Sequence, residues 1–93
     1  LPGNDVSGLS MLKVFPNPAQ EMATVAFPAG GQAEGQVELF SATGQLLRTV
    51  PVQSGDREIS LSLGQYPAGL YTVGWRSRDG AMLSIQKLII QRN

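Results

Sequence analysis

The acidic side chains are the groups in this sequence that could supply acid–base catalysis. They are Asp5, Glu21, Glu34, Glu38, Asp56, Glu58 and Asp79. Glycoside hydrolysis needs two carboxylates that face one cleft at a separation of about 5–10 Å. Asp56 and Glu58 share a face if a strand begins early there, but the turn residues Ser54 and Gly55 explain them equally well as solvated charges. The spacing therefore favours a protein that is not an enzyme.

Histidine and cysteine are both absent, and this removes further kinds of site. Histidine is the usual general base near neutral pH and the commonest transition-metal ligand. Catalysis by Ser-His-Asp or Cys-His groups and ordinary zinc sites are therefore excluded within this sequence. The segments "SGDRE" and "RDG" offer too few oxygen ligands for calcium and read better as hairpin turns. We expect no metal and no cofactor.

Charge and hydropathy argue against two kinds of partner. Seven basic residues balance seven acidic ones, so no basic face is available for nucleic acid. No apolar run approaches the roughly 20 residues that span a bilayer, which argues against direct membrane insertion. The opening "LPGNDVSGLS" also lacks the basic and apolar regions of a signal peptide. We therefore expect that this sequence comes from the end of a longer, exported precursor.

Aromatic side chains raise the alternative of an accessory sandwich in a secreted hydrolase, acting as a carbohydrate-binding module or a spacer. Tyr71, Val73 and Trp75 share one face of a predicted strand, and such a face is most simply a core face. Tyr66 precedes Pro67 in a predicted loop and is the better candidate for an exposed sugar platform.

Alternating apolar residues and turn signals predict seven strands. Their ranges are 11–15, 22–27, 36–41, 46–52, 57–63, 70–77 and 82–90. Gly44 stands where a turn needs a positive φ, and Asp79-Gly80 is a strong hairpin signal. The spacing predicts an all-β fold: a single small immunoglobulin-like antiparallel β-sandwich. We expect residues 1–11 to be a linker from a preceding cargo domain and residues 12–93 to be the sandwich.

Three local features refine this prediction. Pro51 inside its strand indicates an edge position or a bulge. Lys87 interrupts an apolar face of the last strand, which also favours an edge, because lysine discourages edge pairing. In "VFPNPAQ", Pro16 ends the first strand, and Asn17 is held extended by Pro18, so a stiff corner results. We favour a structural role for both prolines.

Four motifs occur in order between Leu12 and Arg92: "VFPNPA", "VELFSATGQLL", "LGQYPAGLYTV" and "KLIIQRN". Together they resemble the type A C-terminal sorting domains of the type IX (Por) secretion system. Departures fall at surface positions. Members often carry an aspartate or asparagine after the aromatic residue, where this sequence has Ser41-Ala42-Thr43, and Gln45 replaces a commoner arginine or lysine.

The resemblance implies a non-catalytic secretion signal at the end of a cargo protein. Such cargo enters the periplasm of a Gram-negative bacterium by an ordinary signal peptide. The type IX translocon, with an associated outer-membrane shuttle, then recognises the folded domain. A sortase-like surface peptidase usually removes the domain, and the cargo is attached to the outer-membrane surface or released outside the cell.

The resemblance also assigns roles to residues. The expected translocon-recognition segment is Lys87, Leu88, Ile89, Ile90, Gln91 and Arg92. The motif positions with mainly structural roles are Pro16, Asn17, Pro18, Gly44, Gly69 and Tyr71. The expected cleavage region is Leu1, Pro2, Gly3, Asn4, Asp5, Val6, Ser7 and Gly8. Strand addition or docking at a sheet edge is the expected mode of recognition, and an isolated domain could pair through its edges as a homodimer.

Overall fold

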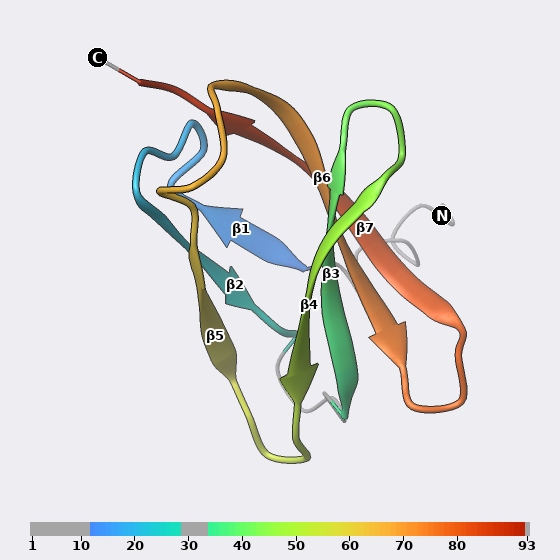
Figure 1. Cartoon of the computed structure of the whole chain (residues 1–93). Helices are drawn as coiled ribbons and strands as arrows, with labels where there is room; N and C mark the ends of the chain where they lie inside the picture. The colour runs from blue at the N-terminus through green and yellow to red at the C-terminus, as the bar shows by residue number, and fades with distance from the viewer. Residues whose placement is uncertain (1–11, 29–33, 93) are drawn as a thin grey trace, which may run out of the picture.

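The computed structural model describes residues 12–28 and 34–92, which form seven strands (Figure 1). The strands are β1 (Lys13–Phe15), β2 (Met22–Ala26), β3 (Gly35–Ser41), β4 (Leu46–Val52), β5 (Glu58–Ser62), β6 (Gly69–Ser77) and β7 (Met82–Ile90). Within these ranges, no helix is long and apolar enough to cross a membrane.

The strands form two antiparallel sheets. One has the order β1-β2-β5 and the other has the order β4-β3-β6-β7. The chain changes sheet between β2 and β3, between β4 and β5, and between β5 and β6, as in immunoglobulin-like sandwiches. The predicted all-β sandwich is confirmed.

The core lies between the sheets and is filled by the alternation that the sequence shows. Val25 and Leu61 come from the three-stranded sheet, and Val37, Leu39 and Val73 come from the four-stranded sheet; each is at most 1% exposed. Because successive side chains on a strand point to opposite faces, every second residue reaches this core. Apolar burial of this kind is the main favourable contribution to folding.

The two edge predictions are confirmed, and one expectation about exposure is wrong. β4, which contains Pro51, and β7, which contains Lys87, are the two edges of the four-stranded sheet. Tyr66 is half-buried rather than exposed, because its ring packs against the core and lies 6.1 Å from the ring of Tyr71. Trp75 is 3% exposed and belongs to the core, as predicted.

The start of β6 is held by a tyrosine corner. The hydroxyl of Tyr71 donates a 2.6 Å hydrogen bond to the carbonyl oxygen of Pro67, four residues earlier. In immunoglobulin-like sandwiches, a tyrosine at this point fixes the loop that leads into the strand. The motif "LGQYPAGLYTV" thus ties the β5–β6 connection to the core.

Glycines serve two purposes in this fold: they adopt positive φ values in turns, and they allow two backbone segments to lie close together. Gly44 and Gly80 have φ values of 93° and 99° in the hairpin turns where the sequence places them. Gly35, with a φ of 143°, begins β3 where the chain passes close to β6. A Cβ atom there would lie 2.1 Å from the carbonyl oxygen of Arg76, so only glycine fits without a backbone shift.

An ion pair between a buried carboxylate and a partly exposed guanidinium lies on the outer face of the four-stranded sheet. Glu38 is 5% exposed, and Nε of Arg76 lies 3.1 Å from both of its carboxylate oxygens. Gln36 donates a further hydrogen bond to the same carboxylate. Glu38 pairs with Gly74 in β6, and the side chain of Met82 lies over that glycine. The hydrogen bond from Arg76 is the main cause that lowers the pKa of Glu38, against the opposing effect of burial.

We expect this carboxylate to make the domain sensitive to acid. Because the pKa of Glu38 is lowered on folding from its usual 4.5, its stabilising effect is complete above that value and is lost as the pH falls through the folded pKa. Urea unfolding followed between pH 7 and pH 3 should show a steeper loss of stability for the wild type than for Glu38→Gln. Asp79→Asn removes an exposed turn carboxylate whose pKa is also lowered, by its hydrogen bond with Ser77. Because water competes for that exposed hydrogen bond, this variant should lose less of the wild-type slope than Glu38→Gln does. Equal slopes for Glu38→Gln and the wild type would contradict this assignment.

Candidate recognition site

The corner after β1 brings the beginning of the domain to its end. β1 belongs to the three-stranded sheet, yet Ala19 forms a parallel bridge with Ile90 at the edge of the other sheet. The amide of Ala19 donates to the carbonyl oxygen of Ile89, and the amide of Gln91 donates to the carbonyl oxygen of Ala19, both at 2.8 Å. The two sheets are therefore joined at this corner.

The side chain of Asn17 continues this pairing. Its Nδ2 donates to the carbonyl oxygen of Lys87, and its Oδ1 accepts from the amide of Ile89, both at 2.9 Å. A carboxamide offers one acceptor and two donor hydrogens, so it can pair with a strand edge as a peptide group does. The peptide bonds Phe15–Pro16 and Asn17–Pro18, on either side of Pro16 and Asn17, are both cis. Sequence reasoning missed this contact, although an asparagine between two prolines marked the position.

Arg92 anchors the segment that follows β7. Its Nη1 donates to the carbonyl oxygen of Gln20 at 2.6 Å and lies 3.3 Å from the carboxylate of Glu21. Its Nη2 donates to the carbonyl oxygen of Leu63 at 2.7 Å and also to that of Tyr66. These acceptors belong to the β1–β2 and β5–β6 connections, so the guanidinium is engaged with the domain itself.

The other five residues of the expected recognition segment divide into two groups. Leu88 and Ile90 are 0% and 1% exposed and lie in the core. Lys87, Ile89 and Gln91 are exposed. On the folded domain, a partner can therefore touch the second group but not the side chains of the first.

The expected mode of recognition, strand addition, meets an obstacle at this segment. The carbonyl oxygen of Lys87, the amide and carbonyl of Ile89 and the amide of Gln91 are all bonded to Asn17 or Ala19. A partner strand needs these same groups, because β-augmentation works through main-chain hydrogen bonds. Strand addition at residues 87–91 would require Asn17 and Ala19 to move away from the edge of β7.

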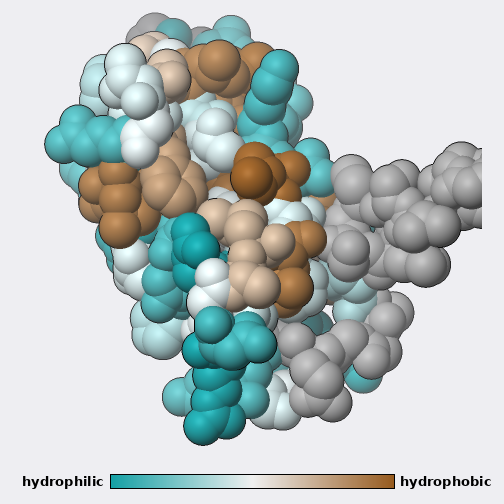
Figure 2. Space-filling model, turned by 90° about the vertical axis from the view of Figure 1, so that its right-hand side faces the viewer, coloured by the Kyte–Doolittle hydropathy of each residue, from teal (hydrophilic) through white to brown (hydrophobic). Residues whose placement is uncertain are grey.

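The outer face beside this segment carries apolar side chains. Ile89 pairs with Leu70, and the two are 46% and 47% exposed. Ile85, on the same face of β7, is 57% exposed and lies opposite Gly74. Figure 2 shows hydrophobic side chains, in brown, among hydrophilic ones, in teal, on the side where Figure 1 places β7. Lys87 supplies a positive charge between Ile85 and Ile89.

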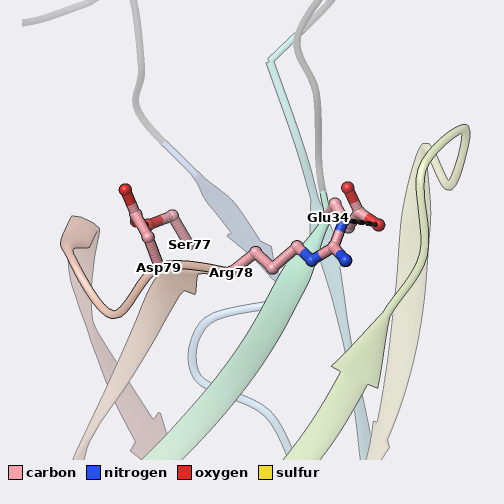
Figure 3. Close-up of a pocket in the computed structure, with 4 residues that line it drawn as sticks. All are labelled: Glu34, Ser77, Arg78 and Asp79. Carbon is pink, nitrogen blue, oxygen red and sulfur yellow. Dashed lines mark hydrogen bonds and ion pairs between the residues drawn. The ribbon is translucent and has the colours of Figure 1, made fainter.

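A pocket at the β6–β7 hairpin does not resemble an active site. Arg78 reaches towards Glu34 and forms an exposed 3.2 Å ion pair, while the hydroxyl of Ser77 donates to Asp79 within the turn (Figure 3). That hydrogen bond is the main cause that lowers the pKa of Asp79, so this carboxylate is a weak base.

Two further acidic groups also have structural contacts. Asp56 accepts a 2.9 Å hydrogen bond from the amide of Gln53 and closes the β4–β5 turn. Glu21 pairs with Arg92. Within residues 12–28 and 34–92, no three acidic side chains gather as a metal site would require. The predicted cleavage region, residues 1–8, lies outside the described residues.

Comparison with known families identifies the chain. The family of secretion system C-terminal sorting domains matches residues 13–91, and the chain belongs to this family, whose members are signals for type IX secretion. No curated protein and no solved structure matches significantly. The domain is thus a non-catalytic sorting signal for the type IX machinery, and it marks its protein for export.

Proposed function

We propose that the folded domain carries a periplasmic cargo protein to the outer-membrane type IX translocon and is recognised through the exposed side chains of residues 87–91. The observation that carries this proposal is that hydrogen bonds join two of the family motifs. The corner in "VFPNPA" and the strand in "KLIIQRN" are 70 or more residues apart in sequence, yet they form one surface. A signal of this kind exists only when the domain is folded.

The chemistry of this surface suggests its partner. Lys87 is a cation on a half-apolar face, and Ile89 and Leu70 beside it are partly exposed. A complementary surface on the translocon or its outer-membrane shuttle would offer an apolar groove with a carboxylate opposite Lys87. A few side chains buried at the centre of an interface supply most of its binding free energy, and a charge pair adds orientation.

Processing of the cargo completes the proposal. Residues 1–8 are rich in glycine and polar residues, which suits cleavage by a sortase-like surface peptidase. The cargo would then stay at the cell surface or leave the cell. The sugar-binding alternative loses its main support, since Trp75 and Tyr71 are buried and Tyr66 packs against the core.

The proposal is tested with a fluorescent reporter that carries a signal peptide at its start and residues 1–93 at its end. In a host with the type IX translocon, we expect this fusion outside the cell or on its surface. The same reporter without residues 12–93 serves as the control and should stay in the periplasm. Periplasmic retention of both proteins would contradict the proposed function.

A further inference from the structure

The outer edge of β7 is covered by the domain itself along residues 87–91, and half of the hydrogen bonds that cover it depend on one side chain. An edge strand with unpaired amide and carbonyl groups is a template for pairing with another chain. Along residues 87–91, two of the outward groups bond to the backbone of Ala19 and two bond to the carboxamide of Asn17. Asn17 is exposed, so it does not contribute to the core.

The residues beside Asn17 suit a segment that ends a ladder. Pro16 and Pro18 lack the amide hydrogen that a further strand would need as a donor. The corner therefore satisfies the edge of β7 without offering a full new edge of its own. Of the twenty side chains, asparagine and glutamine alone combine a carbonyl acceptor with an amide donor, and the shorter asparagine meets Lys87 and Ile89 at 2.9 Å.

We propose that Asn17 is a positioning residue that guards the edge of β7: it prevents a β-strand of a second copy of the domain from pairing with residues 87–91. The same two hydrogen bonds hold Lys87 and Ile89 with their side chains facing outward. This second consequence rests on the proposed function, because it matters only if those side chains are recognised. Protection of the edge against pairing, by contrast, can be measured on the purified domain without any export machinery.

The test compares three variants of the full 93-residue chain with the wild type. Asn17→Leu removes both hydrogen bonds, and Asn17→Asp keeps an acceptor for Ile89 but loses the donor to Lys87. Gln20→Leu is the control, because it places the same apolar side chain at an exposed position on the same connection. Amide hydrogen exchange at Ile89 reports the hydrogen bond, and analytical ultracentrifugation reports the oligomeric state.

For Asn17→Leu at a concentration low enough that the variant is monomeric, we expect amide exchange at Ile89 about fivefold faster or more, as the loss of one ordinary hydrogen bond predicts. We also expect concentration-dependent dimers. The wild type and Gln20→Leu should remain monomeric with slow exchange, and Asn17→Asp should dimerise with a smaller change at Ile89. Dimer formation separates a guard from a merely structural contact, because a lost contact alone does not create a dimer.

Two results would contradict the proposed role of Asn17. One is unchanged exchange at Ile89 in Asn17→Leu, and the other is a monomer at every concentration in both Asn17 variants. If circular dichroism shows that Asn17→Leu does not fold, Asn17→Asp decides by the same two measurements. Neither measurement involves export. A wild-type fusion that stays in the periplasm would therefore refute the proposed function alone, and an absent guard would leave the proposed function standing.

Discussion

Deletion of residues 87–93 is expected to abolish export of a fused reporter and to unfold the domain in the same step. The deletion removes Leu88 and Ile90 from the core and Arg92 from its contacts with Leu63 and Tyr66. Loss of one buried aliphatic side chain costs about 2–5 kcal/mol, and domains of this size have a free energy of unfolding of roughly 5–15 kcal/mol. Two such losses exhaust most of that stability. Circular dichroism and the location of the reporter report both effects, and the cargo should stay soluble in the periplasm.

A matched point variant separates recognition from folding. Ile89 lies between Leu88 and Ile90 but is 46% exposed, so Ile89→Ser changes the outward surface and leaves the core in place. We expect the thermal midpoint of this variant to fall by a few degrees at most, since exposed positions contribute little to stability. Export should nevertheless decline. Full export of Ile89→Ser would contradict recognition through this face, and full export of the deletion would contradict the whole account of the segment.

Substitution of Trp75 by alanine is expected to have the largest effect on stability of any single change. The side chain is 3% exposed, and its ring lies 5.2 Å from the ring of Phe27 on the opposite side of the core. Truncation of a buried tryptophan costs about 3–5 kcal/mol through lost contacts and the cavity left behind. Urea unfolding of the purified domain should therefore show a midpoint far below that of the wild type.

Leu70→Ala provides the control on the same strand. Leu70 is 47% exposed on the outer face, and its loss should lower the free energy of unfolding by about 0.5 kcal/mol or less. If Trp75→Ala unfolded at the wild-type midpoint, Trp75 would not be a core residue. An aromatic platform for sugars would then regain support.

Features that depend on neighbouring residues in the sequence could be predicted. The alternation of Leu61 and Leu63, and of Tyr71, Val73 and Trp75, reflects the period of two that a half-buried strand imposes. Pro51 indicated an edge because proline lacks an amide hydrogen, and β4 is an edge. These signals depend only on neighbouring residues, so they can be interpreted without knowledge of the fold.

Features that depend on contacts between distant segments could not be predicted. Only the pairing of β3 with β6 puts Glu38 beside Arg76 and opposite Gly74, and these residues are more than 30 positions apart in the sequence. Asn17 meets Lys87 and Ile89 across about 70 residues of sequence. A loop position suggested exposure for Tyr66, whereas the tyrosine corner folds this loop back onto the core.

The candidate recognition site shows the same division. The family resemblance selected the segment from Lys87 to Arg92 as one unit. The structure separates it into buried Leu88 and Ile90, a guanidinium bonded to the domain, and an exposed remainder. Strand alternation alone could distinguish the two faces of β7, but it could not show which face meets the core. It also gave no sign that Asn17 and Ala19 occupy the edge.

The central claim is that the domain is a type IX sorting signal, and the most direct test is the dependence of export on the translocon. The reporter fused to residues 1–93 is expressed in a host that has the translocon and in the same host without it, and the external fraction is measured in both. The account predicts external reporter only where the translocon is present. Reporter that is retained in both hosts, or that appears outside in both, would contradict it.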